Sequence, residues 1–133
     1  MPAGTKDDPW LLKTPPGSSD ITLYRAPDAS PPALVCIAAG TELRYHLSAI
    51  ADLHQMLKQH GDWMELGNAD EQKDAKPGTV EAWARSPANP VGGWYGIRKG
   101  FRGRFANYVT PVLEALGLVE LEHGPRNNRV RAL

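Results

Sequence analysis

The sequence has a single cysteine, Cys36, and no apolar run of the roughly 18 residues that a membrane span needs. One cysteine excludes an internal disulfide and a zinc site built on cysteine ligands. The N-terminus also lacks the apolar segment behind a basic start that marks a secretory signal. These absences predict a soluble chain in a reducing, cytoplasmic compartment, without a membrane partner.

Motifs of catalysis and of metal binding are missing as well. There is no phosphate-binding loop and no nucleophile elbow. The four histidines follow no metal-ligand spacing, and the neighbouring carboxylates Asp7-Asp8 and Asp70-Glu71 lie in predicted loops. Cys36 stands between two apolar residues, which favours a buried strand cysteine over a nucleophile. We therefore expect no enzymatic activity, no cofactor and no metal.

The charges divide unevenly between the two ends of the chain. Over 133 residues, 15 basic and 15 acidic side chains cancel. Residues 91–133 hold seven basic and three acidic residues, a net charge of +4; residues 1–90 hold the other eight basic and twelve acidic residues, a net charge of −4. A basic C-terminal end suits a polyanionic partner. The pI of about 6.9 is nevertheless lower than that of a dedicated nucleic-acid domain.

Apolar periodicity and turn residues predict an α+β fold, with one domain over residues 21–133. Residues 1–20 are rich in Pro, Gly and Ser and are predicted to form a flexible arm, which Trp10-Leu11-Leu12 could anchor. Strands are predicted over residues 21–25, 33–38 and 42–46, the last two as a hairpin. Together they give a small antiparallel sheet at the N-terminal side, within residues 21–46.

From residue 47 the predicted order is helix, short strand, helix, longer helix and β-hairpin. Ser48 and Gly61 bound the first helix, and Thr79 caps the second. The third helix spans about residues 103–116, where apolar side chains fall on one face. Strands over 118–122 and 129–133 flank a tip rich in turn formers. A stretch of 17 residues, 87–103, separates the second helix from the third.

The segment Tyr108–Leu133 resembles the winged helix-turn-helix family. It contains a helix ending in Leu-Glu-Ala-Leu-Gly-Leu-Val-Glu, followed by a hairpin with Arg and Asn at its tip. The resemblance implies that residues 47–133 form a winged-helix-like unit that binds duplex DNA, with the third helix in the major groove and the hairpin on phosphates. Such proteins are often transcriptional regulators and homodimers. The whole chain also looks like a group of small uncharacterised bacterial proteins.

Carried over by position, the resemblance identifies candidate contact residues. Those of the third helix and its start have side chains suited to base edges: Arg102, Arg104, Asn107 and Thr110. Those of the hairpin tip suit phosphates: Arg126, Asn127, Asn128 and Arg129. The stretch before the helix interleaves rings, cations and glycines, which adds Arg98 and Lys99 for phosphates and Trp94 and Tyr95 for base stacking. That stretch keeps RNA and single-stranded DNA open beside duplex DNA, which the resemblance favours.

Structural alternatives compete with these roles. Six residues at helical spacing could instead be a core stripe: Trp94, Ile97, Phe101, Phe105, Tyr108 and Val112. In the hairpin, Glu120 and Glu122 can face Arg129 and Arg131 as a solvated charge ladder. The alternative function is a protein-interaction or structural module with the same fold and no nucleic-acid binding. Neutralisation of the basic C-terminal segment by the acidic N-terminal half would favour that alternative.

Overall fold

A four-stranded antiparallel sheet forms the N-terminal side of the molecule in the computed structural model, which describes residues 2–133. Its strands, in their order across the sheet, are β1 (Trp10–Lys13), β2 (Asp20–Ala26), β3 (Ala33–Ala38) and β4 (Thr41–His46). Ala39 and Gly40 join β3 to β4, with φ angles of 50° and 79°. Positive φ at both turn positions matches the right-handed twist of a hairpin, and the predicted hairpin is confirmed.

The N-terminal segment departs from the prediction. Trp10–Lys13, inside the predicted arm, pair with β2 in a register from Trp10↔Leu23 to Lys13↔Asp20. The Trp10 side chain is 1% exposed; it packs against Gly4, where a Cβ atom would lie 2.4 Å from the ring, and under the Arg25 guanidinium. These four residues are therefore an integral strand rather than part of an arm. So short a strand carries too little periodicity to be recognised from sequence.

The C-terminal half has the predicted order of elements. These are α1 (Ala49–His60), β5 (Met64–Glu65), α2 (Val80–Trp83), α3 (Phe105–Ala115), β6 (Val119–Leu121) and β7 (Arg129–Ala132), and the second sheet has the order β5-β7-β6. Gly61 ends α1 in the left-handed conformation, and its N–H donates to the Leu57 carbonyl. Thr79 Oγ1 accepts the Ala82 N–H at 3.2 Å. Both boundaries follow from local chemistry, as predicted; Ser48 makes no side-chain cap.

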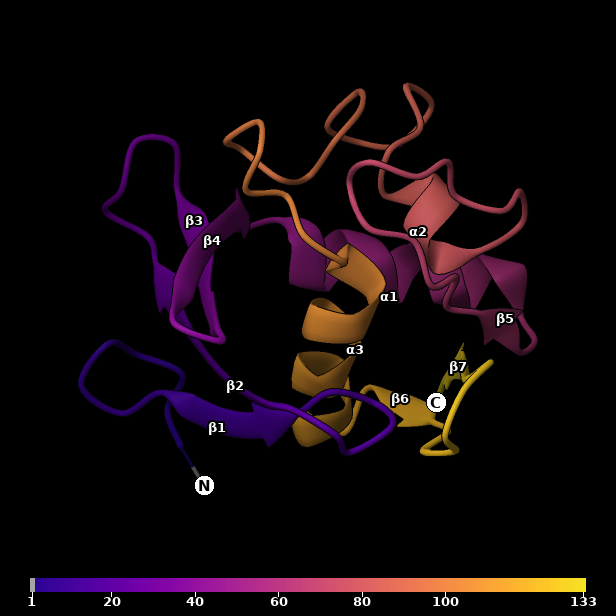
Figure 1. Cartoon of the computed structure of the whole chain (residues 1–133), viewed down its shortest axis with the longest axis horizontal. Coiled ribbons are helices and arrows are strands. Elements are labelled where there is room, and N and C mark those ends of the chain that lie inside the picture. The colour runs from indigo at the N-terminus through magenta and orange to yellow at the C-terminus, as the bar shows by residue number, and fades with distance from the viewer. Residues whose placement is uncertain (1) are drawn as a thin grey trace.

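Helix α3 lies at the centre of the molecule, between the four-stranded sheet and the small sheet (Figure 1). The inner face of the first sheet presents one apolar residue from each strand in register: Trp10, Leu23, Cys36 and Leu43. Tyr45 of β4 meets Phe105 of α3 edge-to-face, with ring centroids 5.5 Å apart. Both sheets and α3 thus share one hydrophobic core, which confirms the α+β class.

The stretch 87–103 packs against the sheet instead of projecting from it. The Tyr95 carbonyl accepts the His46 N–H at 3.0 Å, and the Ile97 N–H donates to the Arg44 carbonyl at 2.9 Å. Gly96 allows the stretch to fold tightly on itself, since a Cβ there would lie 2.9 Å from the Arg102 Cα. The stretch therefore covers part of the β4 edge, which would otherwise expose unpaired backbone groups.

Candidate nucleic-acid interface

The predicted contact residues of α3 divide between the core and the surface. Thr110 is fully buried, and its Oγ1 donates to the Ala106 carbonyl at 2.6 Å. The prediction of Thr110 as a base contact is therefore wrong. No residue of α3 is fully exposed, because the helix packs against α1, α2, β1 and β6. Arg104, which precedes the helix, and Asn107, in its first turn, remain accessible and line a cleft.

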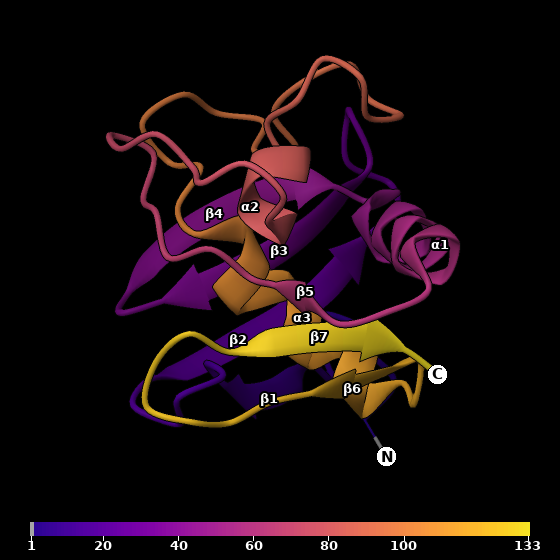
Figure 2. The same cartoon turned by 90° about the vertical axis from the view of Figure 1, so that its right-hand side faces the viewer.

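This cleft, of about 610 Å³, joins segments that are distant in the sequence. One wall is the β1–β2 turn, and another is the tip of the β6–β7 hairpin, residues 123–128, which reaches toward that turn (Figure 2). The N-terminal end of α3, the loop after β5 and the β3–β4 turn complete it. Eight of the lining residues carry a cationic, amide or phenol side chain: Asn68, Lys76, Arg104, Asn107, Tyr108, Arg126, Asn127 and Asn128.

The charges in the cleft are not balanced. Its two acidic residues already have cationic partners: Asp20 pairs with Lys13 at 2.6 Å, and Glu65 pairs with Lys76 at 3.4 Å. In residues 2–133, neither Arg104 nor Arg126 forms an ion pair. Both are exposed. The cleft therefore presents two guanidinium groups that are free to bind an anion.

A buried carboxylate occupies the backbone amides at the start of α3. Glu81 of α2 is 1% exposed, and its Oε1 accepts the Ala106 N–H at 3.0 Å. Its Oε2 accepts the Arg85 Nε–H at 3.3 Å. Burial raises the pKa of Glu81 from 4.5 to about 7, and the bonds from Ala106 and Arg85 oppose that rise. An anion in the cleft thus depends on side chains, because the amides that helix termini offer are taken.

Glu81 and Arg85 are residues that sequence reasoning missed. Their (i, i+4) spacing was the one available signal, and on most helices it marks a solvated pair. The Arg85 guanidinium also donates to the carbonyls of Ala69, Asp70 and Lys73, at 2.9, 2.7 and 2.6 Å. It thereby fixes the loop after β5, whose cleft residues include two with polar side chains, Asn68 and Lys76.

The hairpin forms the charge ladder that was the structural alternative. Arg129 pairs with Glu122 at 2.9 Å, and Arg131 pairs with Glu120 at 2.7 Å. Arg129, predicted as a phosphate contact, is thus already neutralised. Asn128 is only 8% exposed, and its amide exchanges two hydrogen bonds with the Gly124 backbone. Asn128 therefore lines the cleft with an amide that is already committed to the shape of the hairpin tip.

The aromatic residues predicted to stack on bases are engaged by the protein. Tyr95 is fully buried, stacked 5.1 Å from the Trp83 ring, and its hydroxyl donates to Asp52 at 2.9 Å. Its prediction as a stacking residue is wrong, because the ring lies in the hydrophobic core. Trp94 is half-buried, with the guanidinium groups of Arg85 and Arg102 lying 4.4 and 4.6 Å from its ring centroid.

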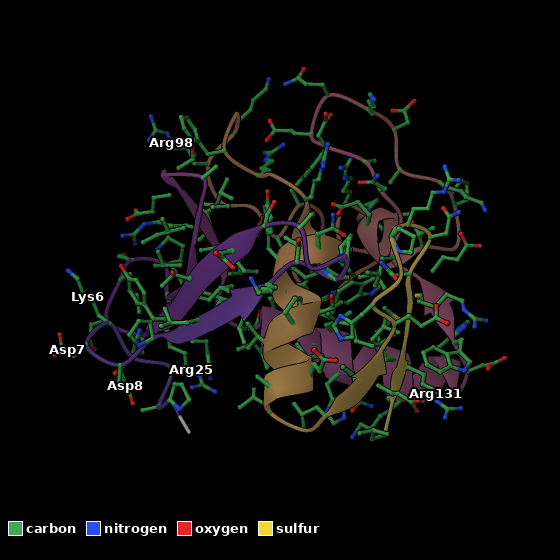
Figure 3. All side chains as sticks on the ribbon, turned by 60° about the horizontal axis from the view of Figure 1, so that its bottom comes forward. Lys6, Asp7, Asp8, Arg25, Arg98 and Arg131 are labelled. Atoms are coloured by element: carbon green, nitrogen blue, oxygen red, sulfur yellow. The ribbon has the colours of Figure 1, made fainter. Side chains whose placement is uncertain are left out.

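The remaining basic candidates lie away from the cleft. Arg98 and Lys99 are exposed, and Arg98 lies over the Phe101 ring at 4.3 Å. Glu71, whose role the sequence did not indicate, holds this loop by accepting the N–H groups of Gly100 and Arg102 at 2.7 and 2.8 Å. Arg98 and Arg131 lie at opposite sides of the molecule (Figure 3). The basic C-terminal segment therefore does not form one continuous surface.

Within residues 2–133, no helix is long and apolar enough to cross a membrane. The same residues contain no group of three or more His, Cys, Asp or Glu side chains placed to hold a metal ion. Burial raises the pKa of the Cys36 thiol to about 12, so this strand cysteine remains a protonated, unreactive thiol.

The fold and the cleft together define an α+β protein with a basic, amide-rich cleft between two antiparallel sheets. Residues 2–133 match a family of unknown function, DUF6855, and the chain belongs to this family. Comparison with curated proteins found no match, and neither did comparison with solved structures.

Proposed function

We propose that this protein binds nucleic acid, with DNA as the expected partner, at the cleft between the start of α3 and the hairpin tip. The observation that carries the proposal is the convergence of four predicted contact residues on that cleft: Arg104, Asn107, Arg126 and Asn127. Two of them are exposed arginines without ion pairs, which suits contacts to phosphate oxygens.

The distribution of ion pairs supports a polyanionic partner over the protein-interaction alternative. Seven ion pairs form among residues 2–133, and none joins residues 1–90 to residues 91–133. The acidic half of the chain therefore does not neutralise the basic segment. Cations without a carboxylate partner remain at Arg98, Lys99, Arg102, Arg104 and Arg126, and such groups attract phosphates over a range set by salt.

The order of elements supports a winged-helix-like unit, with a changed mode of contact. The order α1-β5-α2-α3-β6-β7 and the sheet order β5-β7-β6 place a hairpin directly after the third helix. The burial of α3 leaves no face to enter a major groove, because the N-terminal sheet and α1 pack on it. In this mode Arg104 and Arg126 contact the phosphates of a strand that lies on the cleft, and α3 does not enter a major groove.

The test is fluorescence anisotropy of labelled DNA titrated with the full chain at several salt concentrations. We expect a Kd of about 10⁻⁴ to 10⁻⁶ M that rises steeply with salt. Arg104→Ala and Arg126→Ala should each weaken binding and reduce the salt slope by about one. Arg98→Ala is the matched control, since Arg98 is also exposed and without an ion pair but lies outside the cleft.

Losses of affinity and slope in both cleft variants that clearly exceed those of Arg98→Ala would support the proposal. Absence of binding to any DNA at low salt would overturn it. Equal losses in all three variants would place the contact on a diffuse surface instead of the cleft, and would also count against it. Circular dichroism and thermal unfolding of each variant would verify that the fold is kept.

A further inference from the structure

The dimensions of the cleft restrict what can enter it. A volume of about 610 Å³ falls within the roughly 300–1,000 Å³ of sites for small molecules and cofactors. Its walls come from five segments, one of them the β3–β4 turn, and the Asn128–Gly124 hydrogen bonds shape the hairpin tip among them. A space of this size accepts a nucleotide, whereas a double helix can contact only its rim.

The uncommitted groups of the cleft are of two kinds. Arg104 and Arg126 suit phosphate. The side-chain amides of Asn68, Asn107 and Asn127 make no hydrogen bond within residues 2–133, and an amide can donate and accept at a base edge. In an intact duplex the base edges are reached only by an element that enters a groove, and α3 is covered by its neighbours and cannot do so.

One aromatic ring lines the cleft, that of Tyr108 in the first turn of α3. The ring is half-buried and fixed beside Gly103, where a Cβ atom would lie 3.0 Å from the Tyr108 Cε2 atom. Burial raises the pKa of the Tyr108 phenol, so the hydroxyl stays protonated at neutral pH and can donate. Cations, amides and a fixed ring are the combination with which proteins hold unpaired bases.

We propose that the cleft accepts an unpaired nucleotide of a single strand, with Arg104 and Arg126 on its phosphates and the amide of Asn107 on the base edge. This inference rests on the proposed function and narrows it, because it predicts single-stranded over duplex DNA as the preferred ligand. The duplex that the winged-helix resemblance favours then becomes the weaker ligand, since α3 is not available to read it.

The experiment compares a labelled single-stranded oligonucleotide of about 12 nucleotides with its duplex, at one salt concentration chosen so that both bind measurably. The wild-type protein should bind the single strand about tenfold more tightly. Asn107→Ala should weaken single-strand binding about tenfold, as expected for loss of one amide–base pair, and weaken duplex binding clearly less. The variant is conservative for the fold, since Asn107 makes no side-chain hydrogen bond and Ala favours a helix.

The outcomes separate this inference from the proposed function. Duplex binding as tight as single-strand binding, still lost in Arg104→Ala, would overturn the unpaired-nucleotide site and leave the nucleic-acid function standing. An equal effect of Asn107→Ala on both ligands would also overturn it. A third result would also overturn the unpaired-nucleotide site. If inorganic phosphate displaced the single strand as effectively as an unlabelled oligonucleotide does, the cleft would be a site for anions in general. Absence of binding to either form would reject the proposed function itself.

Discussion

Replacement of Glu81 by Gln tests which of two opposing effects dominates at the buried end of α2. The Glu81 carboxylate is 1% exposed and bonded to the Ala106 amide and to Arg85. If the ion pair dominates, loss of the charge is costly at neutral pH, typically by about 3–5 kcal/mol. If desolvation dominates, the buried carboxylate itself destabilises the fold. The stability of Glu81→Gln relative to the wild type should then increase as the pH rises.

We expect desolvation to dominate. It raises the pKa of folded Glu81 from 4.5 to about 7, while Arg85 keeps three backbone carbonyls as partners when Glu81 is neutral. Between these two pKa values the unfolded chain releases the proton and the folded chain retains it, so stability falls as pH rises through this window. At about 1.4 kcal/mol for each tenfold change in proton affinity, the loss reaches about 3 kcal/mol.

The assay is urea unfolding of the wild type and Glu81→Gln at about pH 4.5 and about pH 8, bracketing that window. The free energy of unfolding of the wild type should fall by about 3 kcal/mol more than that of the variant over this interval. Glu120→Gln, which removes an exposed hairpin carboxylate, is the control and should follow the wild type. The reasoning would be refuted if the free energies of unfolding of the wild type and of Glu81→Gln changed in parallel between the two pH values. It would also be refuted if the variant lost more stability than the wild type at the higher pH.

Three further outcomes follow from named contacts. Trp10→Ala should lower the free energy of unfolding by about 3–5 kcal/mol in urea titrations, because the Trp10 ring is 1% exposed in the core. A negligible loss would instead support the flexible arm predicted from the sequence. Arg131→Ala should cost less than about 1 kcal/mol in the same assay, since its pair with Glu120 is half-exposed, and DNA affinity should not change. His123→Ala should destabilise at about pH 6 and have little effect at about pH 9. The Glu114 carboxylate and the Pro15 carbonyl face the two ring nitrogens of His123 and raise its pKa in the folded protein. The contribution of His123 to the free energy of unfolding is therefore fully present at a pH below its pKa in the unfolded chain. It is lost as the pH rises through its pKa in the folded protein.

The elements governed by neighbours in the chain could be predicted from sequence. The β3–β4 hairpin follows from a short turn between two apolar runs, and α1 ends at Gly61 because only glycine enters the left-handed conformation without strain. The alternation of Glu120 and Glu122 against Arg129 and Arg131 likewise predicted the charge ladder. In each case the interacting groups lie within a few residues or on adjacent strands of one hairpin.

The residues that form the cleft could be named in part, but their convergence could not be foreseen. Arg104, Asn107, Arg126 and Asn127 were candidates because of their residue types, while Asn68 and Lys76 had no distinguishing signal. Whether a polar residue at the start of a helix reaches a given hairpin depends on packing between elements, which periodicity does not encode.

The sequence by itself determined the α+β class, the order of elements after residue 47 and the turn and cap residues that bound them. Only the tertiary structure decided that Trp10–Lys13 complete the first sheet, and that this sheet and α1 pack on α3 and bury Thr110. The reason is physical: helical spacing shows that one face of α3 is buried, but not that other elements cover the remaining faces. The same packing that removes α3 from the surface leaves Arg104 and Arg126 together in one cleft.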